Sequence, residues 1–474
     1  MDGKAGQSCS AFCLWEEFSL CATIAAIATG QAPGGIGVIR ISGPQALEIA
    51  QRIFRSLSGR TLGEIPGYQA LLGQIFERDG RALDDCVALV FRAPKSYTGE
   101  DVVELSCHGG LYVTRRVLEE VLAAGAVPAG RGEFTKRAYL NGKLDLAQAE
   151  SVMEMISASG RQAARMAQAA GSGRLSHKLG AICARLEEAA AHLAAWADFP
   201  EEDVEMLSLD ELSQTLRNSA AELRTLLAHF DQGRVYREGL RTVIVGRPNV
   251  GKSTFMNWLA GRERSIVTPY AGTTRDVVEE PVVLAGIPLL LADTAGLRET
   301  ADPVEEIGVA AARRRLASAE LVLAVFDQSQ ALTKEDFQLL EQLGEVPAIG
   351  VVNKSDLENR LDRQALKEHF SYLVECSAAS GQGLEALENA LGSLLGTDGF
   401  DPDEGELFTQ RQRAAASRAG EALGQALEAL EGGMTLDAVT VCLEGALAAL
   451  YELTGQRVSD EVVDQVFERF CVGK

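Results

Sequence analysis

The sequence has few of the features that mark secreted, membrane-spanning or zinc-binding proteins. Its nine cysteines include no C-x-x-C pair, so neither a zinc ribbon nor a disulfide framework is indicated, and a reducing compartment fits. No apolar run approaches the roughly 20 residues that a transmembrane helix needs. We therefore expect a cytoplasmic protein that makes no contact with a membrane.

Positive charge is also scarce. Lys and Arg number 45 against 67 Asp and Glu, which gives a formal net charge of −22. Non-specific binding to nucleic acid depends on neutralising phosphates, so this balance argues against it. Any contact with RNA should then be local or shared with a partner. Taken alone, the charge is that of an ordinary acidic protein.

The N-terminal segment lacks the signature of a targeting signal. Residues 1–22 carry one Lys and three acids and contain no long apolar core. This composition fits neither a secretory nor a mitochondrial signal. We expect a loose N-terminal extension over residues 1–22.

A phosphate-binding loop is predicted near the middle of the chain. Residues 242–245 are a short β-branched run, typical of a buried strand, and residues 246–253 match G-x-x-x-x-G-K-[ST]. The loop glycines let backbone N–H groups approach phosphate oxygens. Lys252 can neutralise the β/γ charge, and the Ser253 hydroxyl can hold Mg²⁺. The alternative is a glycine-rich turn that matches by chance.

Three later segments have the order found in GTPases, and each follows a predicted strand. Asp293 to Gly296 (DTAG) can reach the metal and the γ-phosphate. Asp356, in the box 353–356 (NKSD), can accept from N1–H and the 2-amino group of guanine, which adenine cannot supply. A backbone N–H of Ser377 or Ala378 could meet guanine O6. The sequence therefore predicts a Ras-like P-loop GTPase domain with a doubly wound sheet.

Composition and periodicity divide the rest of the chain. With 474 residues we expect two to four domains. Residues 23–140 alternate strand and helix patterns and predict a compact α/β domain. Helical periodicity fills residues 141–238 and returns in 397–474, on either side of the GTPase domain at 239–396. The expected architecture is multidomain α/β, with the GTPase domain inserted into a discontinuous all-α domain.

Specific segments outside the GTPase motifs identify a family. They are residues 35–43 (GIGVIRISG), 96–101 (SYTGED), 108–110 (HGG), 132–138 (GEFTKRA), 140–150 (LNGKLDLAQAE), 198–200 (DFP) and 470–474 (FCVGK). With them the chain resembles the MnmE/TrmE family of tRNA-modification GTPases from Thr23 onward. The resemblance implies that the N-terminal domain binds folate and dimerises. It also implies an FAD-dependent MnmG-type partner and shared binding of tRNA.

The activity that the resemblance implies is addition of a (carboxymethyl)aminomethyl group at C5 of the wobble uridine. A tetrahydrofolate derivative, of the 5-formyl or 5,10-methylene type, would be the one-carbon donor. The competing hypothesis is a ribosome-assembly switch of the Era type, which performs no substrate chemistry. The folate-type N-terminal domain and the C-terminal CVGK sequence favour tRNA modification, because Era-like proteins append RNA-binding modules instead.

The motifs alone do not identify the catalytic residues. Leu297 stands where Ras-type enzymes place a water-orienting Gln, so another group must assist hydrolysis. Asn249 could hold a monovalent cation beside the β/γ bridge, and a simple turn residue is an equally good local interpretation. By resemblance, K⁺ is held by Asn249, Thr268, Tyr270 and Thr273, while Thr274 joins Ser253 on Mg²⁺. Resemblance also makes Glu305 the general base, whereas the sequence alone shows only one of several exposed acids.

The complete expected site follows from these motifs and from the resemblance. The expected catalytic residues are Glu305, Lys252 and Asn249. The residues expected to contact GTP are Asn249, Val250, Gly251, Lys252, Ser253, Thr254, Thr268, Pro269, Tyr270, Ala271, Gly272, Thr273, Thr274, Asp293, Thr294, Ala295, Gly296, Asn353, Lys354, Asp356, Ser377, Ala378 and Ala379.

A folate site is expected in the N-terminal domain by resemblance. Arg40, Glu104, Lys143 and the final Lys474 match the family's folate-contacting positions. A pterin presents a donor edge that suits a carboxylate, and its glutamate tail suits Arg or Lys. Without the resemblance, Arg40 and Lys143 would be surface charges and Glu104 an ion-pair partner. Cys471 remains open between a reactive thiol and a hydrophobic plug.

Overall fold

The structure is a computed structural model that describes residues 22–30, 32–198, 208–261, 281–291, 318–344, 346–397 and 399–473. Its contacts divide the chain into two compact units, Met1–Met153 with Tyr451–Lys474, and Glu154–Leu450. This division cuts through helices α5 (Leu146–Ser157) and α15 (Leu436–Thr454). The domain boundaries expected from the sequence stay predictions.

The first unit is built on a seven-stranded sheet in the order β3-β4-β5-β6-β2-β1-β7. Its strands are β1 Ile24–Ile27, β2 Ile36–Ser42, β3 Phe54–Ser56, β4 Gln69–Phe76, β5 Ala82–Phe91, β6 Val102–His108 and β7 Val127–Pro128. All neighbours are antiparallel except β1 and β7. Alternate residues therefore face opposite sides of the sheet, and one side is packed against helices.

Helices cover one face of this sheet, whereas the other face is exposed along β4 and β5. The helices are α2 Ala46–Ile53 and α3 Leu111–Ala123, with the short 3₁₀ helix Leu62–Glu64 beside them. Ile39 and Leu105 of the sheet and Val121 of α3 are fully buried in the core that the sheet and helices share. Leu72 and Val87, which are paired across β4 and β5, are 57% and 39% exposed on the other face.

The C-terminal helix packs within this same unit. Helix α16 (Asp460–Glu468) buries Val463 and Phe467 against Leu146 of α5, and it contacts α4 (Glu133–Leu140). It begins after Ser459, the N-cap residue, whose side chain makes no capping hydrogen bond. The apolar face of α16 thus fixes where the chain ends.

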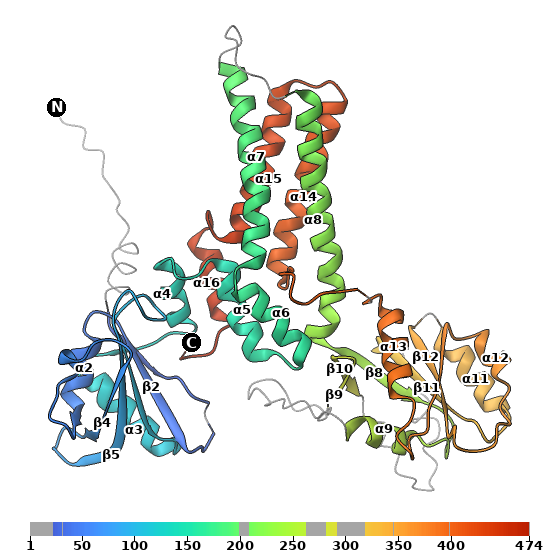
Figure 1. Cartoon of the computed structure of the whole chain (residues 1–474), viewed down its shortest axis with the longest axis horizontal. Coiled ribbons are helices and arrows are strands. Elements are labelled where there is room, and N and C mark those ends of the chain that lie inside the picture. Colours follow the sequence, from blue (N-terminus) through green and yellow to red (C-terminus); the bar gives the residue numbers. More distant parts are fainter. Residues whose placement is uncertain are drawn as a thin grey trace, which may run out of the picture. The chain divides into compact units, whose positions relative to one another are not determined.

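The second unit contains long helices contributed by two distant parts of the sequence. They are α6 Arg161–Gly171, α7 Arg174–Asp198, α8 Leu209–Glu238 and α14 Gln410–Glu431. Figure 1 shows α8, in green, running alongside α14, in red, and the two are in extensive contact. An ion pair of 2.6 Å between Arg217 and Glu431 joins them.

A six-stranded sheet forms the rest of this unit, in the order β13-β12-β11-β8-β10-β9. The strands are β8 Leu240–Val245, β9 Pro281–Leu284, β10 Ile287–Leu291, β11 Leu321–Asp327, β12 Ala348–Asn353 and β13 Tyr372–Glu375. The helices are α9 Lys252–Ala260, α11 Lys334–Leu343, α12 Arg363–Lys367 and α13 Leu384–Leu395. Every pairing is parallel except β9 with β10.

Both faces of this sheet are buried, as a doubly wound fold requires. Leu323 and Val325 of β11 point into a core with Phe255 of α9, whereas the alternate residues Ala324 and Phe326 point into a core with α11. The predicted multidomain α/β fold is confirmed. Within the described ranges, no helix combines the length and the apolar character needed to cross a membrane.

Candidate functional site

The predicted phosphate-binding loop connects β8 to α9, and its backbone depends on glycine at two points. Gly246 has φ of +147°, and an added Cβ would lie 2.3 Å from the Val325 carbonyl oxygen. Gly251 has φ of +97°, and its Cβ would lie 2.5 Å from Nδ2 of Asn353. Between them Asn249 is left-handed, with φ of +68°. The loop is therefore held against β11 and β12 in a conformation that L side chains disfavour.

Lys252 lies at the first position of α9 and points back into the loop. Its Nζ donates to the carbonyl oxygens of Gly246 and Arg247, both at 2.7 Å. Burial lowers the pKa of Lys252, since the charged form loses hydration. Phosphate oxygens could take the place of these carbonyls. Ser253 and Thr254 are exposed in the first turn of α9, where the helix N-terminus favours anions.

The residues expected to bind guanine are brought together by side-chain contacts. Asn353, which is 2% exposed, donates to the Val250 carbonyl oxygen at 3.0 Å and accepts from the Ala378 N–H at 3.1 Å. Ser377 Oγ donates to Asp356 Oδ1 at 2.6 Å. One amide thus joins the phosphate loop to the Ser377–Ala378 segment, although these residues are far apart in the sequence.

Asp327 is a residue of this site that the sequence reasoning missed. It ends β11 with its side chain fully buried, and its Oδ2 lies 2.6 Å from Lys354 Nζ, which also donates to the Asn249 carbonyl oxygen at 2.9 Å. Burial works against the charged form, but hydrogen bonds from Lys354 and Ser329 outweigh it and lower the pKa of Asp327. The sequence did contain a signal for this residue, because Asp327 is an acidic residue at the end of a strongly apolar strand.

Arg247 and Asp336 form a second contact that the motif did not reveal. Arg247 Nε lies 2.9 Å from the Asp336 carboxylate, whose side chain is 1% exposed. Asp336 also accepts from the Thr333 N–H at 2.8 Å and so caps the start of α11. The phosphate loop is anchored to α11 through this pair.

Part of the expected GTP site lies outside the described residues. This part comprises Thr268, Pro269, Tyr270, Ala271, Gly272, Thr273 and Thr274, then Asp293, Thr294, Ala295 and Gly296, and also Glu305. Ala379 lies in the described chain beside Ser377 and Ala378. The assignments of individual residues to GTP, Mg²⁺ and K⁺ stay predictions.

Two of the residues expected to contact folate, Arg40 and Glu104, lie on the same face of the N-terminal sheet. Arg40 of β2 and Glu104 of β6 are directly paired in the sheet register, and Arg40 Nε lies 2.8 Å from Glu104 Oε1. The Tyr97 and Phe134 rings lie 5.6 and 5.5 Å from the Arg40 guanidinium carbon. Lys143 Nζ donates to the Pro94 carbonyl oxygen at 3.2 Å. Aromatic rings, a carboxylate and a cation therefore share one surface.

The C-terminal segment lies against this same domain. Val472 forms an isolated antiparallel bridge with Arg131, and the Gly132 N–H donates to the Cys471 carbonyl oxygen at 3.3 Å. Gly473 has φ of +97°, and a Cβ there would lie 2.3 Å from the Ile27 carbonyl oxygen. The chain end thus approaches β1, the strand that pairs with β2. Lys474 lies outside the described residues.

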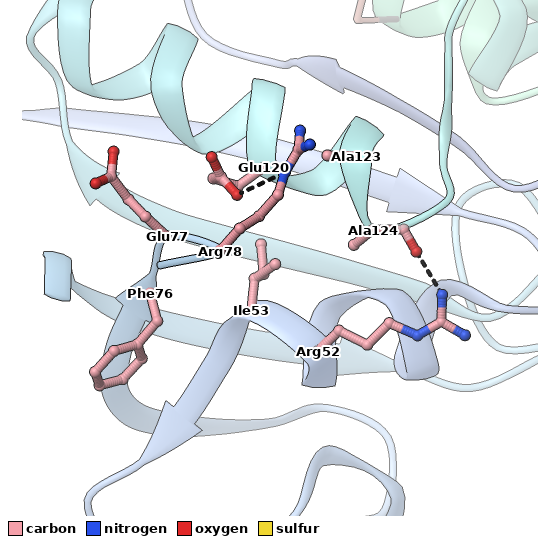
Figure 2. Close-up of a pocket in the computed structure, with 8 residues that line it drawn as sticks. All are labelled: Arg52, Ile53, Phe76, Glu77, Arg78, Glu120, Ala123 and Ala124. Carbon is pink, nitrogen blue, oxygen red and sulfur yellow. Dashed lines mark hydrogen bonds and ion pairs between the residues drawn. The ribbon is translucent and has the colours of Figure 1, made fainter. Parts of the chain in front are cut away.

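A small pocket of about 230 Å³ lies elsewhere in this domain, lined by the ends of α2, β4 and α3 (Figure 2). Glu120 is one of the lining residues, and its Oε2 lies 3.5 Å from Arg78 Nε while its Oε1 accepts from Arg116. Arg52 donates to the Ala124 carbonyl oxygen. These charged groups bind one another and do not converge on a ligand.

Comparison with known proteins agrees with this architecture. A family model described as "MnmE helical domain" matches residues 146–471, and one described as "GTP-binding protein TrmE N-terminus" matches residues 23–143. Together these matches favour tRNA modification over the Era-type alternative. The G domain of a T. maritima FeoB iron transporter is 26% identical over 33% of this chain and 98% of its own, with a TM-score of 0.25, too weak to add to the family models.

Full-length relatives carry the same description. The "tRNA modification GTPase MnmE" of Symbiobacterium thermophilum is 47% identical over 95% of this chain and 99% of its own length. The protein of the same description from Heliobacterium modesticaldum is 43% identical over 95% of this chain and 99% of its own length. The expected activity, a GTPase that acts in tRNA modification, is confirmed. This chain belongs to the MnmE/TrmE family of tRNA modification GTPases.

Proposed function

We propose that this enzyme hydrolyses GTP in a K⁺-dependent reaction and adds a (carboxymethyl)aminomethyl group at C5 of the wobble uridine. It would act as a homodimer in the cytoplasm, with an FAD-dependent MnmG-type partner and a tetrahydrofolate derivative. The observation that carries the proposal is the position of the chain end. Val472 and Gly473 lie against Arg131 and β1, beside the sheet face that holds Arg40 and Glu104.

The chemistry of that face suits a folate. The Glu104 carboxylate can accept hydrogen bonds from the donor edge of a pterin, and the Tyr97 ring offers an apolar surface. Arg40 is then a positioning residue, because its ion pair at 2.8 Å fixes the orientation of Glu104. Lys143 can neutralise a ligand carboxylate. The bound folate would supply the one-carbon unit, and these residues would bind and orient it.

Exposed apolar residues favour a second copy of the chain as the occupant of the part of this sheet face formed by β4 and β5. Leu72 and Val87 are a cross-strand pair on that face, and Leu57, which is 70% exposed, donates its N–H to the Leu72 carbonyl oxygen. Contiguous apolar surface of this kind is usually covered in an assembly. Dimerisation through the N-terminal domain would remove these side chains from water.

For hydrolysis, Asn249 would hold K⁺ beside the phosphates, and Lys252 and Ser253 would bind phosphate and Mg²⁺. The left-handed Asn249 backbone is fixed through its carbonyl, which accepts from Lys354, and its side chain is exposed at the loop. A cation there would supply the charge that an arginine finger supplies elsewhere. Turnover should be faster in K⁺ than in Na⁺ at equal ionic strength, and Asn249→Ala should erase the difference.

The role of Glu305 as general base has its own test. Glu305→Ala should keep nucleotide affinity and lose turnover, because a base acts in the transition state and not in ground-state binding. Nucleotide affinity is measured by titration, and turnover by phosphate release under saturating GTP. Turnover equal to that of the wild type would remove Glu305 from the mechanism.

The experiment that tests the folate proposal is a calorimetric titration. A formylated tetrahydrofolate is titrated into the full-length chain and into a variant that lacks Gly473 and Lys474. The truncation should weaken folate binding by about tenfold, the loss expected for one charge-assisted contact. GTP hydrolysis should persist in the truncated protein, which shows that it is folded. Equal affinities would exclude the chain end from the folate site.

A further inference from the structure

The carboxylate assigned to guanine recognition lies on an exposed loop. Asp356 is exposed, as are the residues that follow it, and Ser377 Oγ contacts one of its oxygens, Oδ1. Two hydrogen bonds to the guanine edge require both carboxylate oxygens in a fixed plane. A loop on the surface is ordinarily mobile, so something beneath it must fix this orientation.

Gln328 is placed to do this. It directly follows β11 and is 4% exposed. Its Nε2 donates to the carbonyl oxygens of Ser355, at 3.3 Å, and Leu357, at 2.8 Å, the residues on either side of Asp356. Its backbone N–H donates to the Asn353 carbonyl oxygen at 3.0 Å. One buried residue therefore holds two carbonyl groups of the guanine box at residues 353–356 and the carbonyl of the residue that follows it.

The orientation of the Gln328 amide is itself determined. Arg363 Nη2 donates to Gln328 Oε1 at 2.8 Å. A guanidinium can only donate, so Oε1 must face Arg363 and the NH₂ group must face the loop. Arg363 lies in α12 and also pairs with Glu375 at the end of β13. The amide is thus fixed from the side opposite to Asp356.

We propose that Gln328 is a positioning residue for guanine specificity. By holding the Ser355 and Leu357 carbonyls, it keeps the Asp356 carboxylate where it accepts from both N1–H and the 2-amino group. The inference rests on the proposed assignment of Asp356 to guanine. Removing the Nε2 donors would also leave two carbonyls without this partner and release the loop. Substitution of Gln328 should therefore weaken recognition of the guanine base and leave binding of the phosphates unchanged.

The test compares GDP with inosine diphosphate, which lacks the 2-amino group, on the full-length chain. Gln328→Met keeps the length of the side chain and removes both donors. The preference for GDP over the inosine nucleotide should fall about three- to tenfold, because a hydrogen bond to a charged group is weakened. The matched control is Gln330→Met, an exposed residue of the same loop whose amide contacts Asp327 and does not reach residues 355–357. The Gln330→Met variant should prefer GDP over inosine diphosphate to the same extent as the wild type.

Two outcomes separate the inference from the assignment on which it rests. If Gln328→Met weakens both diphosphates by one common factor, or leaves their ratio unchanged, Gln328 has only a structural role. If Asp356→Asn does not shift preference from GDP to xanthosine diphosphate, the guanine assignment itself fails and the role of Gln328 fails with it. Should Gln328→Met not fold, Arg363→Met removes the orienting donor instead. It should lower the same ratio by a smaller factor, and an unchanged ratio would overturn the proposal.

Discussion

The two sheets of this enzyme place their candidate functional residues in different ways. In the GTPase sheet, whose strands are parallel except for β9, candidate residues lie where strands end, at Gly246, Asn353 and Ser377. In the N-terminal sheet, which is antiparallel except for β7, Arg40 and Glu104 lie in the middle of strands on the same face. The reason is burial, because helices cover both faces of the first sheet and one face of the second.

This difference decides which kind of group can do chemistry. A sheet buried on both faces offers a ligand only its edge, where backbone N–H groups and glycine turns are available. A sheet with an open face can present side chains across its strands, and these are paired by register rather than by sequence distance. Arg40 and Glu104 are 64 residues apart in the sequence, and yet Arg40 Nε lies 2.8 Å from Glu104 Oε1.

The largest effect should come from removing the cation of the phosphate loop. Lys252→Ala should lower GTP hydrolysis by about 100- to 1,000-fold, the loss expected for one preorganised donor at a developing charge. The measurement is phosphate release under saturating GTP. Lys334→Ala, at the exposed start of α11, is the control and should behave as the wild type. A rate within threefold of the wild type for Lys252→Ala would show that backbone groups alone suffice.

The ion pairs of the two sheets should differ in their contribution to stability. Arg247→Met leaves the Asp336 carboxylate, which is 1% exposed, without its cation. The unfolding free energy of the GTPase domain should fall by about 3 kcal/mol, as for other broken buried pairs. Arg40→Met breaks a pair whose side chains are 18% and 21% exposed, and it should cost about 1 kcal/mol. Denaturant titrations measure the unfolding free energy of each variant. Equal losses for Arg247→Met and Arg40→Met would show that burial does not set the contribution of these ion pairs to stability.

The parts of the fold and site that the sequence predicted are those encoded locally. The loop at residues 246–253 and the box at 353–356 were recognisable because glycine requirements and strand ends are local properties. Helical periodicity was expected over residues 141–238. The structure divides this stretch into α5, α6, α7 and α8, with a left-handed Gly173 between α6 and α7. Helical periodicity continues across such a turn and does not reveal it.

The missed residues are those whose partners come from distant segments. Gln328 holds a loop 27 and 29 residues away, and Arg247 binds a helix cap 89 residues away. Neither contact leaves a pattern in the sequence, because a single Gln or Arg is ordinarily a surface residue. The folate positions were reached by resemblance alone, since nothing local distinguishes Arg40 or Lys143 from other surface cations.

The smallest predicted effect tests whether the two sheets open independently. Burial raises the pKa of Cys376, at the end of β13, to about 12, and burial together with Asp84 raises that of Cys107, in β6, to about 11. Both thiols should therefore resist iodoacetamide at pH 8 unless their region opens. Mass spectrometry of the labelled peptides gives the labelling rates of Cys376 and Cys107 in one sample.

Bound GDP should protect only one of these thiols. Exposing Cys376 requires β13 to leave β12, because the Cys376 N–H donates to the Val352 carbonyl oxygen. The next residue, Ser377, contacts Asp356, so this opening would also disrupt the guanine box. GDP at ten times its Kd should then slow labelling of Cys376 by about tenfold, since it binds the closed form alone. Labelling of Cys107 should not change, and equal slowing of both thiols would show that the two sheets open as one cooperative unit.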